Sequence, residues 1–268
     1  MIHRIYYILF SFMLLCVACE FKLKPNEDAD DAEHIKVERY DRLQSRYLTT
    51  GDFSALQQMN TEYPIETRTL VEKMLQIGAV SDHDINEKFL RFCQDSTLQT
   101  LINDAESEYA NMDDINKKLE HTFSKLKEWI PELPIPRVYA QIGALDQSIV
   151  VGDKMIGISL DKYMGAKYPV YGRYDYSAEQ LRTMGRNYIV PDCVSFYLLS
   201  LYPMKNYDSR TQLEKDLHMG KVMWVVNKAM GSQMFRTDYV TMVDRYMSRH
   251  HEVTVSQLLE TDDYKDMH

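Results

Sequence analysis

The sequence predicts an α+β fold: one mostly helical domain that carries a small three-stranded antiparallel sheet. Apolar residues recur at helical spacing before residue 130 and again after residue 176. Between these two regions, residues 137–160 alternate between apolar and other side chains, which is typical of strands. The composition, with 45% hydrophobic and 26% charged residues, is that of a globular protein and excludes a wholly disordered chain.

Residues 34–130 are predicted to form a series of helices. The last of them ends where Ile130 precedes Pro131, because proline disfavours helical geometry in the residue before it. The helix over 70–78 follows Tyr63-Pro64 and an acidic first turn at Glu66. Apolar residues three and four positions apart mark helices over 37–47, 70–78, 98–109 and 115–130.

Three short strands are predicted in the middle of the chain. The first covers 137–142, where alternate residues share one face. The second covers 148–151, and Gly152-Asp153 supplies turn residues before the third, over 156–160. Strands so close in sequence favour an antiparallel sheet with one buried face.

Helical spacing returns after a tyrosine-rich stretch at 163–176. Pro191 suits a first helical turn, and an apolar stripe follows it over 194–201. A further helix is predicted from about Ser209 to Met230, with Asp208 or Ser209 as its N-cap. Because its other sides are also apolar, this helix is expected to be buried on most sides. Its predicted inner face consists of Leu213, Leu217, Gly220 and Trp224.

The chain begins with the features of an export signal. The apolar run over 5–17 would span about 20 Å as a helix, which is short for the roughly 30 Å core of a bilayer. It ends in Leu15-Cys16-Val17-Ala18-Cys19, which resembles the lipobox of bacterial lipoproteins, although Cys16 stands where leucine is usual. We predict that residues 1–18 are a lipoprotein signal peptide and that Cys19 is lipidated, which anchors the protein to the membrane. The alternative is a plain cleaved signal peptide in which Cys19 is incidental.

Residues 19–33 are predicted to be an acidic tether, because a block of like charges such as 27–33 stays solvated and extended. An acidic stretch at this position could also act as a surface-export signal, which leaves the membrane face open. Residues 34–260 form the predicted domain and 261–268 a tail. The formal net charge of −9, without a basic stripe, argues against a nucleic-acid partner.

Two cysteines remain in the domain, Cys93 and Cys193, and both lie in apolar helical runs. In an oxidising compartment the two could pair. We expect two buried free thiols instead, because unpaired cysteine packs as a small hydrophobic residue.

No motif for metal or cofactor chemistry is present, so neither is predicted. None of the eight histidines has a second histidine four positions away, and His250-His251-Glu252 is followed by Val255 where a metallopeptidase helix needs histidine. There is no Gly-x-Ser-x-Gly elbow and no phosphate-binding glycine loop. With 40 acidic residues, a catalytic pair of carboxylates remains open.

A cluster of tyrosines is the candidate site for a ligand or partner. Tyrosine offers a large apolar face and one polar tip with few rotors, which suits adaptable contacts. We predict a binding loop here; the alternative is an irregular connection whose rings pack on the protein's own core. Two arginines four residues apart on the following helix could order the loop or bind a carboxylate. The candidate residues are Asp161, Tyr163, Tyr168, Tyr171, Tyr174, Tyr176, Arg182 and Arg186.

Several segments resemble the GldB-like family of gliding-motility lipoproteins of the Bacteroidetes. Besides the lipoprotein signal and Pro191, they are Pro134-Ile135-Pro136-Arg137-Val138-Tyr139, Ile156-Gly157-Ile158-Ser159-Leu160-Asp161-Lys162-Tyr163-Met164-Gly165, and the helix from Leu213 to Gly220-Lys221. That family looks distantly similar to zincin-type metallopeptidases, whose catalytic helix would correspond to about 190–202. This helix has no His-Glu-x-x-His, so the resemblance implies a zincin-like scaffold without its metal motif.

The resemblance implies a non-catalytic protein of the cell envelope, lipid-anchored at the outer membrane, on its periplasmic face or at the cell surface. Such a protein would bind an envelope protein or polymer as an accessory component of gliding or secretion machinery. One alternative is a peptidase-like hydrolase that uses carboxylates in the ancestral groove. Another is a purely structural stabiliser of a membrane complex.

Overall fold

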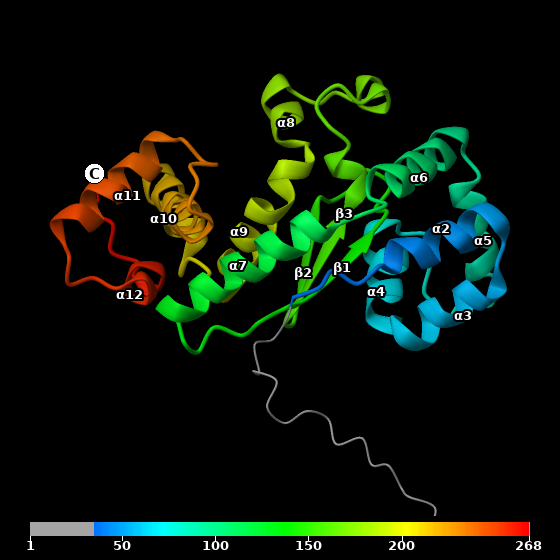
Figure 1. The fold of residues 1–268 in the computed structure, drawn as a ribbon, viewed down its shortest axis with the longest axis horizontal. Coiled ribbons are helices and arrows are strands. Elements are labelled where there is room, and N and C mark those ends of the chain that lie inside the picture. The colour runs from blue at the N-terminus through cyan, green and yellow to red at the C-terminus, as the bar shows by residue number, and fades with distance from the viewer. Residues whose placement is uncertain (1–34, 268) are drawn as a thin grey trace, which may run out of the picture. The chain divides into compact units, whose positions relative to one another are not determined.

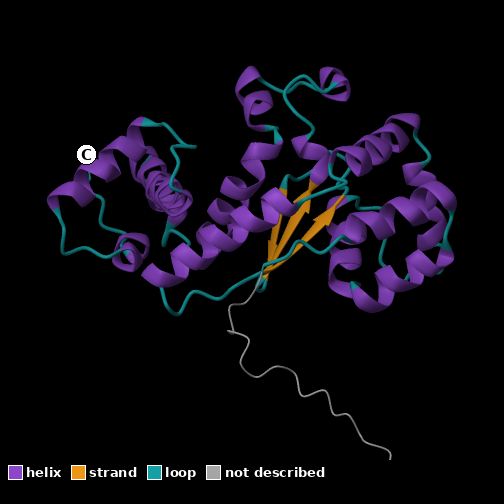
Figure 2. Ribbon diagram, in the orientation of Figure 1, coloured by secondary structure: helices purple, strands orange, loops and turns teal. Residues whose placement is uncertain are grey.

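The computed structural model describes residues 35–267, which are mostly helical and carry one small sheet (Figures 1 and 2). The predicted α+β class is therefore confirmed. The predicted signal peptide, Cys19 and the acidic tether lie outside the described residues. Within residues 35–267, no helix has both the length and the apolar character that crossing a membrane requires.

The first half of the domain is helical, as predicted. Asp52 and Asp95 act as N-caps, because each side chain accepts hydrogen bonds from two backbone amides of the helix that follows. The helix predicted over 70–78 is different: it passes through a π-helical turn and ends at Met74, and Gly78 lies beyond it with a positive φ of 146°. The elements are α2 (Tyr40–Thr50), α3 (Phe53–Glu62), α4 (Pro64–Arg68), η2 (Thr69–Met74), α5 (Ile85–Cys93), α6 (Ser96–Glu108) and α7 (Asp113–Trp129).

The sheet has the order β1-β3-β2, with β1 at Arg137–Gln141, β2 at Ile149–Gly152 and β3 at Met155–Ser159. The antiparallel prediction holds for β2 and β3 but is wrong for β1, which runs parallel to β3. Ile156 and Ile158 are completely buried, so β3 takes the centre of the sheet, and the less buried β2 takes an edge. The β2–β3 hairpin then gives β3 the same direction as β1. Gly157 has no side chain, which leaves room for the ring of Tyr139 on the neighbouring strand.

The second half returns to helices. α10 begins at Gln212, later than predicted, because Thr211 and Glu214 form a capping box; Asp208 and Ser209 lie instead in a preceding 3-10 turn. The elements are η3 (Leu160–Tyr163), η4 (Pro169–Arg173), α8 (Ala178–Thr183), η5 (Arg186–Tyr188), α9 (Ile189–Leu201), η6 (Tyr207–Ser209), α10 (Gln212–Met230), α11 (Asp238–Arg249) and α12 (Val255–Glu260).

α10 is the central helix of this half and packs against α7, α9, α11 and α12. A Cβ on Gly220 would lie 2.8 Å from the Cβ of Tyr239, so this glycine is needed for the close approach of α11. Leu213, predicted to face inward, is 39% exposed. Residues 261–267, predicted as a tail, contribute buried side chains at Tyr264 and Met267.

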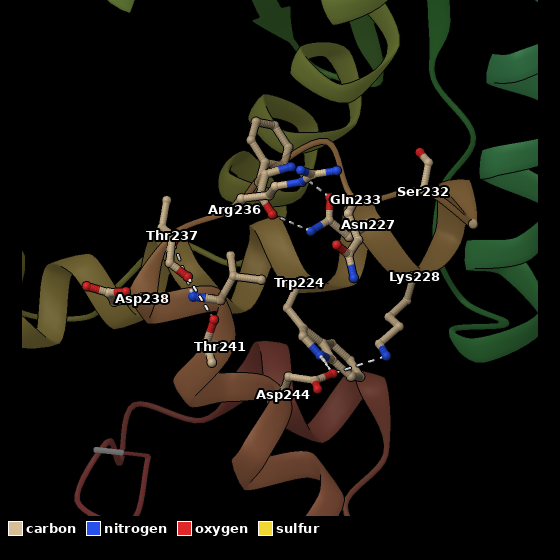
Figure 3. A pocket seen from close by; sticks show the side chains of 13 residues that line it. Trp224, Asn227, Lys228, Ser232, Gln233, Arg236, Thr237, Asp238, Thr241 and Asp244 are labelled. Atoms are coloured by element: carbon tan, nitrogen blue, oxygen red, sulfur yellow. Dashed lines mark hydrogen bonds and ion pairs between the residues drawn. The ribbon is translucent and has the colours of Figure 1, made fainter.

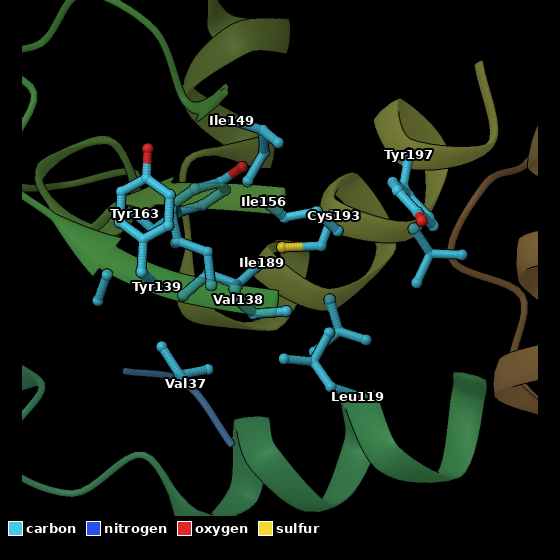
Figure 4. Packing of buried hydrophobic residues seen from close by; sticks show 14 of the residues in the cluster. Val37, Leu119, Val138, Tyr139, Ile149, Ile156, Tyr163, Ile189, Cys193 and Tyr197 are labelled. Atoms are coloured by element: carbon cyan, nitrogen blue, oxygen red, sulfur yellow. The ribbon is translucent and has the colours of Figure 1, made fainter. Parts of the chain in front are cut away.

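Both domain cysteines are buried free thiols, as predicted. Burial raises the pKa of Cys93 to about 12 and that of Cys193 well above its usual value. Cys193 lies between α9 and the sheet, with Val138, Ile156 and Ile189 around it (Figure 4). Neither thiol is therefore ionised near neutral pH, which suits packing rather than reaction.

Candidate functional site: the tyrosine loop

Residues 165–184, which we call the tyrosine loop, leave the domain after η3 and return before α9. Their base is closed by a bridge between Met164 and Gly185 and by a hydrogen bond of 2.8 Å from the amide of Gly165 to the carbonyl of Met184. Gly165 has φ +100°, a conformation that side-chain-bearing residues rarely adopt. The loop, with α8, lies at the top of Figure 1, above the sheet and beside α6.

Asp161 orders the backbone next to the loop. It is completely buried, and its two carboxylate oxygens accept hydrogen bonds from the amides of Gly143 (2.7 Å) and Leu145 (2.5 Å). Burial raises its pKa, while these two amide contacts and the charge of Lys162 act in the opposite direction. Because both carboxylate oxygens accept hydrogen bonds inside the protein, Asp161 stabilises the turn at 143–145, where Ala144 and Leu145 have positive φ.

Tyr163 and Tyr171 point into the core. The hydroxyl of Tyr163 donates to the carboxylate of Asp192 on α9 at 2.8 Å. The hydroxyl of Tyr171 donates to the carbonyl of Asp161 at 2.6 Å and accepts from the amide of Met164 at 3.0 Å. These two rings therefore attach η3, α9 and the tyrosine loop to one another.

Tyr168 and Tyr176 are half-buried and hold the sides of the loop. The hydroxyl of Tyr168 donates to Asp104 of α6 at 2.8 Å. The ammonium of Lys162 lies 3.1 Å from the hydroxyl of Tyr176 and 4.6 Å from the centre of its ring. The rings of Tyr168 and Tyr176 also meet Tyr171 edge-to-face, at centroid distances of 5.2 and 5.7 Å.

The outer face of the tyrosine loop, residues 172–183, is the exposed part. Tyr174 is 43% exposed, and its ring leans on Tyr176 at a centroid distance of 5.9 Å. α8 buries no residue and is held by a capping box of Ser177 and Gln180. On α8, the guanidinium of Arg182 lies 3.7 Å from the carboxylate of Glu179, and both side chains are largely exposed.

Arg182 and Arg186 do not share a helix, contrary to the prediction, because α8 ends at Thr183 and Arg186 lies in η5. Arg186 forms an ion pair with Asp114 (2.6 Å), donates to the carbonyl of Asn111 (2.6 Å) and covers the ring of Tyr109 at 4.9 Å. It therefore attaches η5 to the α6–α7 connection, and its hydrogen bond lowers the pKa of Asp114.

Asp192 lies in the first turn of α9. Burial raises its pKa to about 7, against the opposing effect of the Tyr163 hydrogen bond. Among residues 35–267, no three histidine, cysteine or acidic side chains are grouped so that they could hold a metal ion.

Three acidic residues at the site are not predicted by any sequence pattern. Asp104, Asp114 and Asp192 each accept a hydrogen bond from the candidate residues, yet each comes from a different, distant helix. Only a three-dimensional arrangement identifies them, since none is distinguished by spacing or by neighbours in the sequence.

The fold and site together define an α+β protein of helices around a small mixed sheet, with a tyrosine-rich loop held on its surface. Residues 22–236, more than half of the chain, match the family model described as gliding motility protein GldB. The chain belongs to this family, which confirms the predicted GldB-like relationship and makes it a protein related to gliding motility, of a lipoprotein type. No curated protein matches the chain, and no solved structure matches it. The zincin-like aspect stays a prediction.

Proposed function

We propose that this protein is a non-catalytic, lipid-anchored component of the cell envelope, accessory to a gliding or secretion-type complex. In this proposal Cys19 holds it to the membrane and the outer face of the tyrosine loop binds an envelope protein. Family membership supports the link to gliding, and the sequence pattern at Leu15–Cys19 supports the anchor.

The observation that carries the binding role is that some side chains of this region hold the loop in place while others remain exposed to solvent. Tyr168, Tyr171 and Tyr176 use their hydroxyls inside the protein, as does Tyr163 just before the loop, while Tyr174 and Arg182 face solvent. A surface that is already ordered loses less conformational entropy on binding than a mobile one. Exposed tyrosine and arginine are also the residue types that are enriched in the energetically important parts of protein interfaces.

Affinity capture from native envelopes, with the lipid anchor intact, tests this proposal. Tyr174→Ala and Arg182→Ala are expected to reduce recovery of a specific co-purifying envelope protein. Two exposed residues elsewhere provide matched controls: Tyr207→Ala, which removes a tyrosine of 57% exposure, and Arg91→Ala, which removes an arginine paired within its own helix. Equal recovery from all four variants and wild type would remove the loop from the proposal.

The second candidate function is a hydrolase that uses carboxyl chemistry, and Asp192 is the observation in its favour. A carboxyl group with a pKa of about 7 suits general acid–base catalysis near neutral pH. The hydroxyl of Tyr163 is directed at it. Peptide hydrolysis by the purified protein that disappears in Asp192→Asn, with the fold unchanged, would favour this candidate over the non-catalytic one.

A further inference from the structure

A groove lies between α10 and α11, which we call the α10–α11 groove (Figure 3). Its volume is about 580 Å³, within the roughly 300–1000 Å³ range of small-molecule sites. It is formed by the last turns of α10, the connection 231–237 and the first turns of α11. None of these residues takes part in the tyrosine loop.

The walls of the groove are ordered by the protein itself. The indole of Trp224 donates to the carboxylate of Asp244 at 2.8 Å, and the ammonium of Lys228 lies 3.1 Å from the same oxygen. These contacts join the two helices across one end of the groove, as Figure 3 shows. Asn227 closes the connection by bonding both the carbonyl (2.8 Å) and the amide (3.0 Å) of Phe235.

Other polar groups of the groove remain available. The side chains of Arg236 and Gln233 are exposed and have no hydrogen-bond or ion-pair partner among residues 35–267. Lys228 and Asp244 are paired, yet each keeps about half of its side chain in solvent, at 50% and 51% exposure. The exposed carboxylate of Asp238 also lines the groove. The site therefore offers both donors and acceptors that a ligand can reach.

The balance of charge restricts what can bind. Lys228 and Arg236 oppose a cation, while Asp238 and Asp244 oppose an anion. A wholly apolar ligand would remove these polar groups from water without giving them partners, which is unfavourable. A neutral ligand with many hydroxyl groups satisfies the site, because each hydroxyl can donate to a carboxylate or accept from a cation or amide.

We propose that the α10–α11 groove binds a neutral saccharide, with the sugar hydroxyls bonded by Arg236, Gln233 and the acidic side chains and the apolar face of a ring against Phe235 and Val240. Phe235 and Val240 are half-buried lining residues, so each keeps some apolar surface in the groove. Saccharide binding here would not depend on the partner-binding role of the tyrosine loop.

A peptide fits this groove less well than a saccharide. Both walls are helices, so the groove has no strand edge whose backbone could pair with an extended peptide. A helical peptide needs a mainly apolar groove for its anchoring side chains, whereas polar groups make up most of this lining.

The family match ends at Arg236, so the α11 wall, with Asp238 and Asp244, lies outside the part shared with the family model.

Tryptophan fluorescence of the full-length protein in detergent tests the proposal. The chain has two tryptophans, so Trp129→Phe leaves Trp224 in the groove as the single reporter. The neutral probes are tri-N-acetylchitotriose and maltotriose; trigalacturonate is the anionic probe and trialanine the peptide probe. We expect a saturable change with at least one neutral trisaccharide and none with the other two probes.

Variants in the same background locate the binding. Arg236→Ala and Gln233→Ala are each expected to weaken trisaccharide binding by about tenfold, since each removes a hydrogen-bonding group that has no role in the fold. Arg245→Ala is the matched control, because Arg245 is an exposed arginine of α11 that does not line the groove. Three results would overturn the proposal: no binding of either neutral trisaccharide, binding that Arg236→Ala and Gln233→Ala leave unchanged, or preferential binding of trigalacturonate or trialanine.

Discussion

Replacing Asp192 with asparagine is expected to stabilise the protein above neutral pH. The unfolded chain releases the proton of this carboxyl group near pH 4, whereas the folded protein holds it until about pH 7. Between these values the folded state binds more protons, so this group makes stability fall as pH rises through the window. Below pH 4 both states are protonated and the effect disappears.

The size of the effect follows from the displacement of the pKa. A shift from 3.8 to about 7 corresponds to an upper limit of about 4 kcal/mol at pH 8. Asp192 is half-buried rather than fully enclosed, and solvent screening reduces the limit, so we expect about 1–2 kcal/mol. The amide oxygen of Asp192→Asn can still accept the hydrogen bond of Tyr163.

Urea unfolding of the full-length protein, followed by circular dichroism, measures the free energy of unfolding of wild type and variant. The two pH values, 4.5 and 8, are chosen at about the ends of the window. Asp192→Asn should exceed wild type at the higher pH and approach it at the lower. Asp113→Asn is the control, because Asp113 is an exposed acid in the first turn of α7. It should lose about 0.3–1 kcal/mol at pH 8 through the helix dipole. A loss of stability in Asp192→Asn that is equal at both pH values would refute the reasoning.

The other predictions concern three further features. Lys221 is buried, its ammonium donates to carbonyls at the end of α12, and burial lowers its pKa to about 8. Because the unfolded chain binds more protons than the folded protein above that value, the stability of the wild type should rise with pH above 8. Lys221→Met should lack this rise in unfolding measurements. Gly220→Ala should lower the free energy of unfolding by about 1–3 kcal/mol because of its contact with Tyr239, whereas Gly172→Ala, with nothing within 4 Å, should leave it unchanged. Cys19→Ala should move the protein from the membrane to the soluble fraction and abolish metabolic labelling with palmitate, so continued labelling would contradict the predicted anchor.

The periodicity of the sequence predicts α2, α6, α7, α9 and α10, but it does not predict α11 or α12, nor the neighbours of the strands. Alternation over 137–160 identifies three strands, yet it does not specify which strands pair with each other. Burial decides that order, because Ile156 and Ile158 need the centre of the sheet. The start of α10 could have been predicted more closely: Thr211 and Glu214 have capping-box spacing, a stronger signal than the isolated Asp208 or Ser209.

At the candidate site, composition locates the tyrosines but does not assign their roles. Tyr171 and Tyr174 look equivalent in the sequence, and only the first reaches the buried backbone at Asp161. The acids that accept hydrogen bonds from Tyr163, Tyr168 and Arg186 come from other helices, so no local pattern identifies them. The alternative of rings packed on the core therefore describes most of the cluster, whereas the binding loop stays a prediction that rests on the exposed Tyr174.

The binding role of the tyrosine loop is tested most directly by placing a photo-cross-linker on it in living cells. Tyr174→p-benzoylphenylalanine should give one discrete cross-linked species with an envelope protein after irradiation, because the side chain at this position points into solvent from an ordered loop. The same cross-linker at the exposed position Tyr207 should not give that species. An identical pattern at both positions, or no adduct at 174, would contradict the proposed surface.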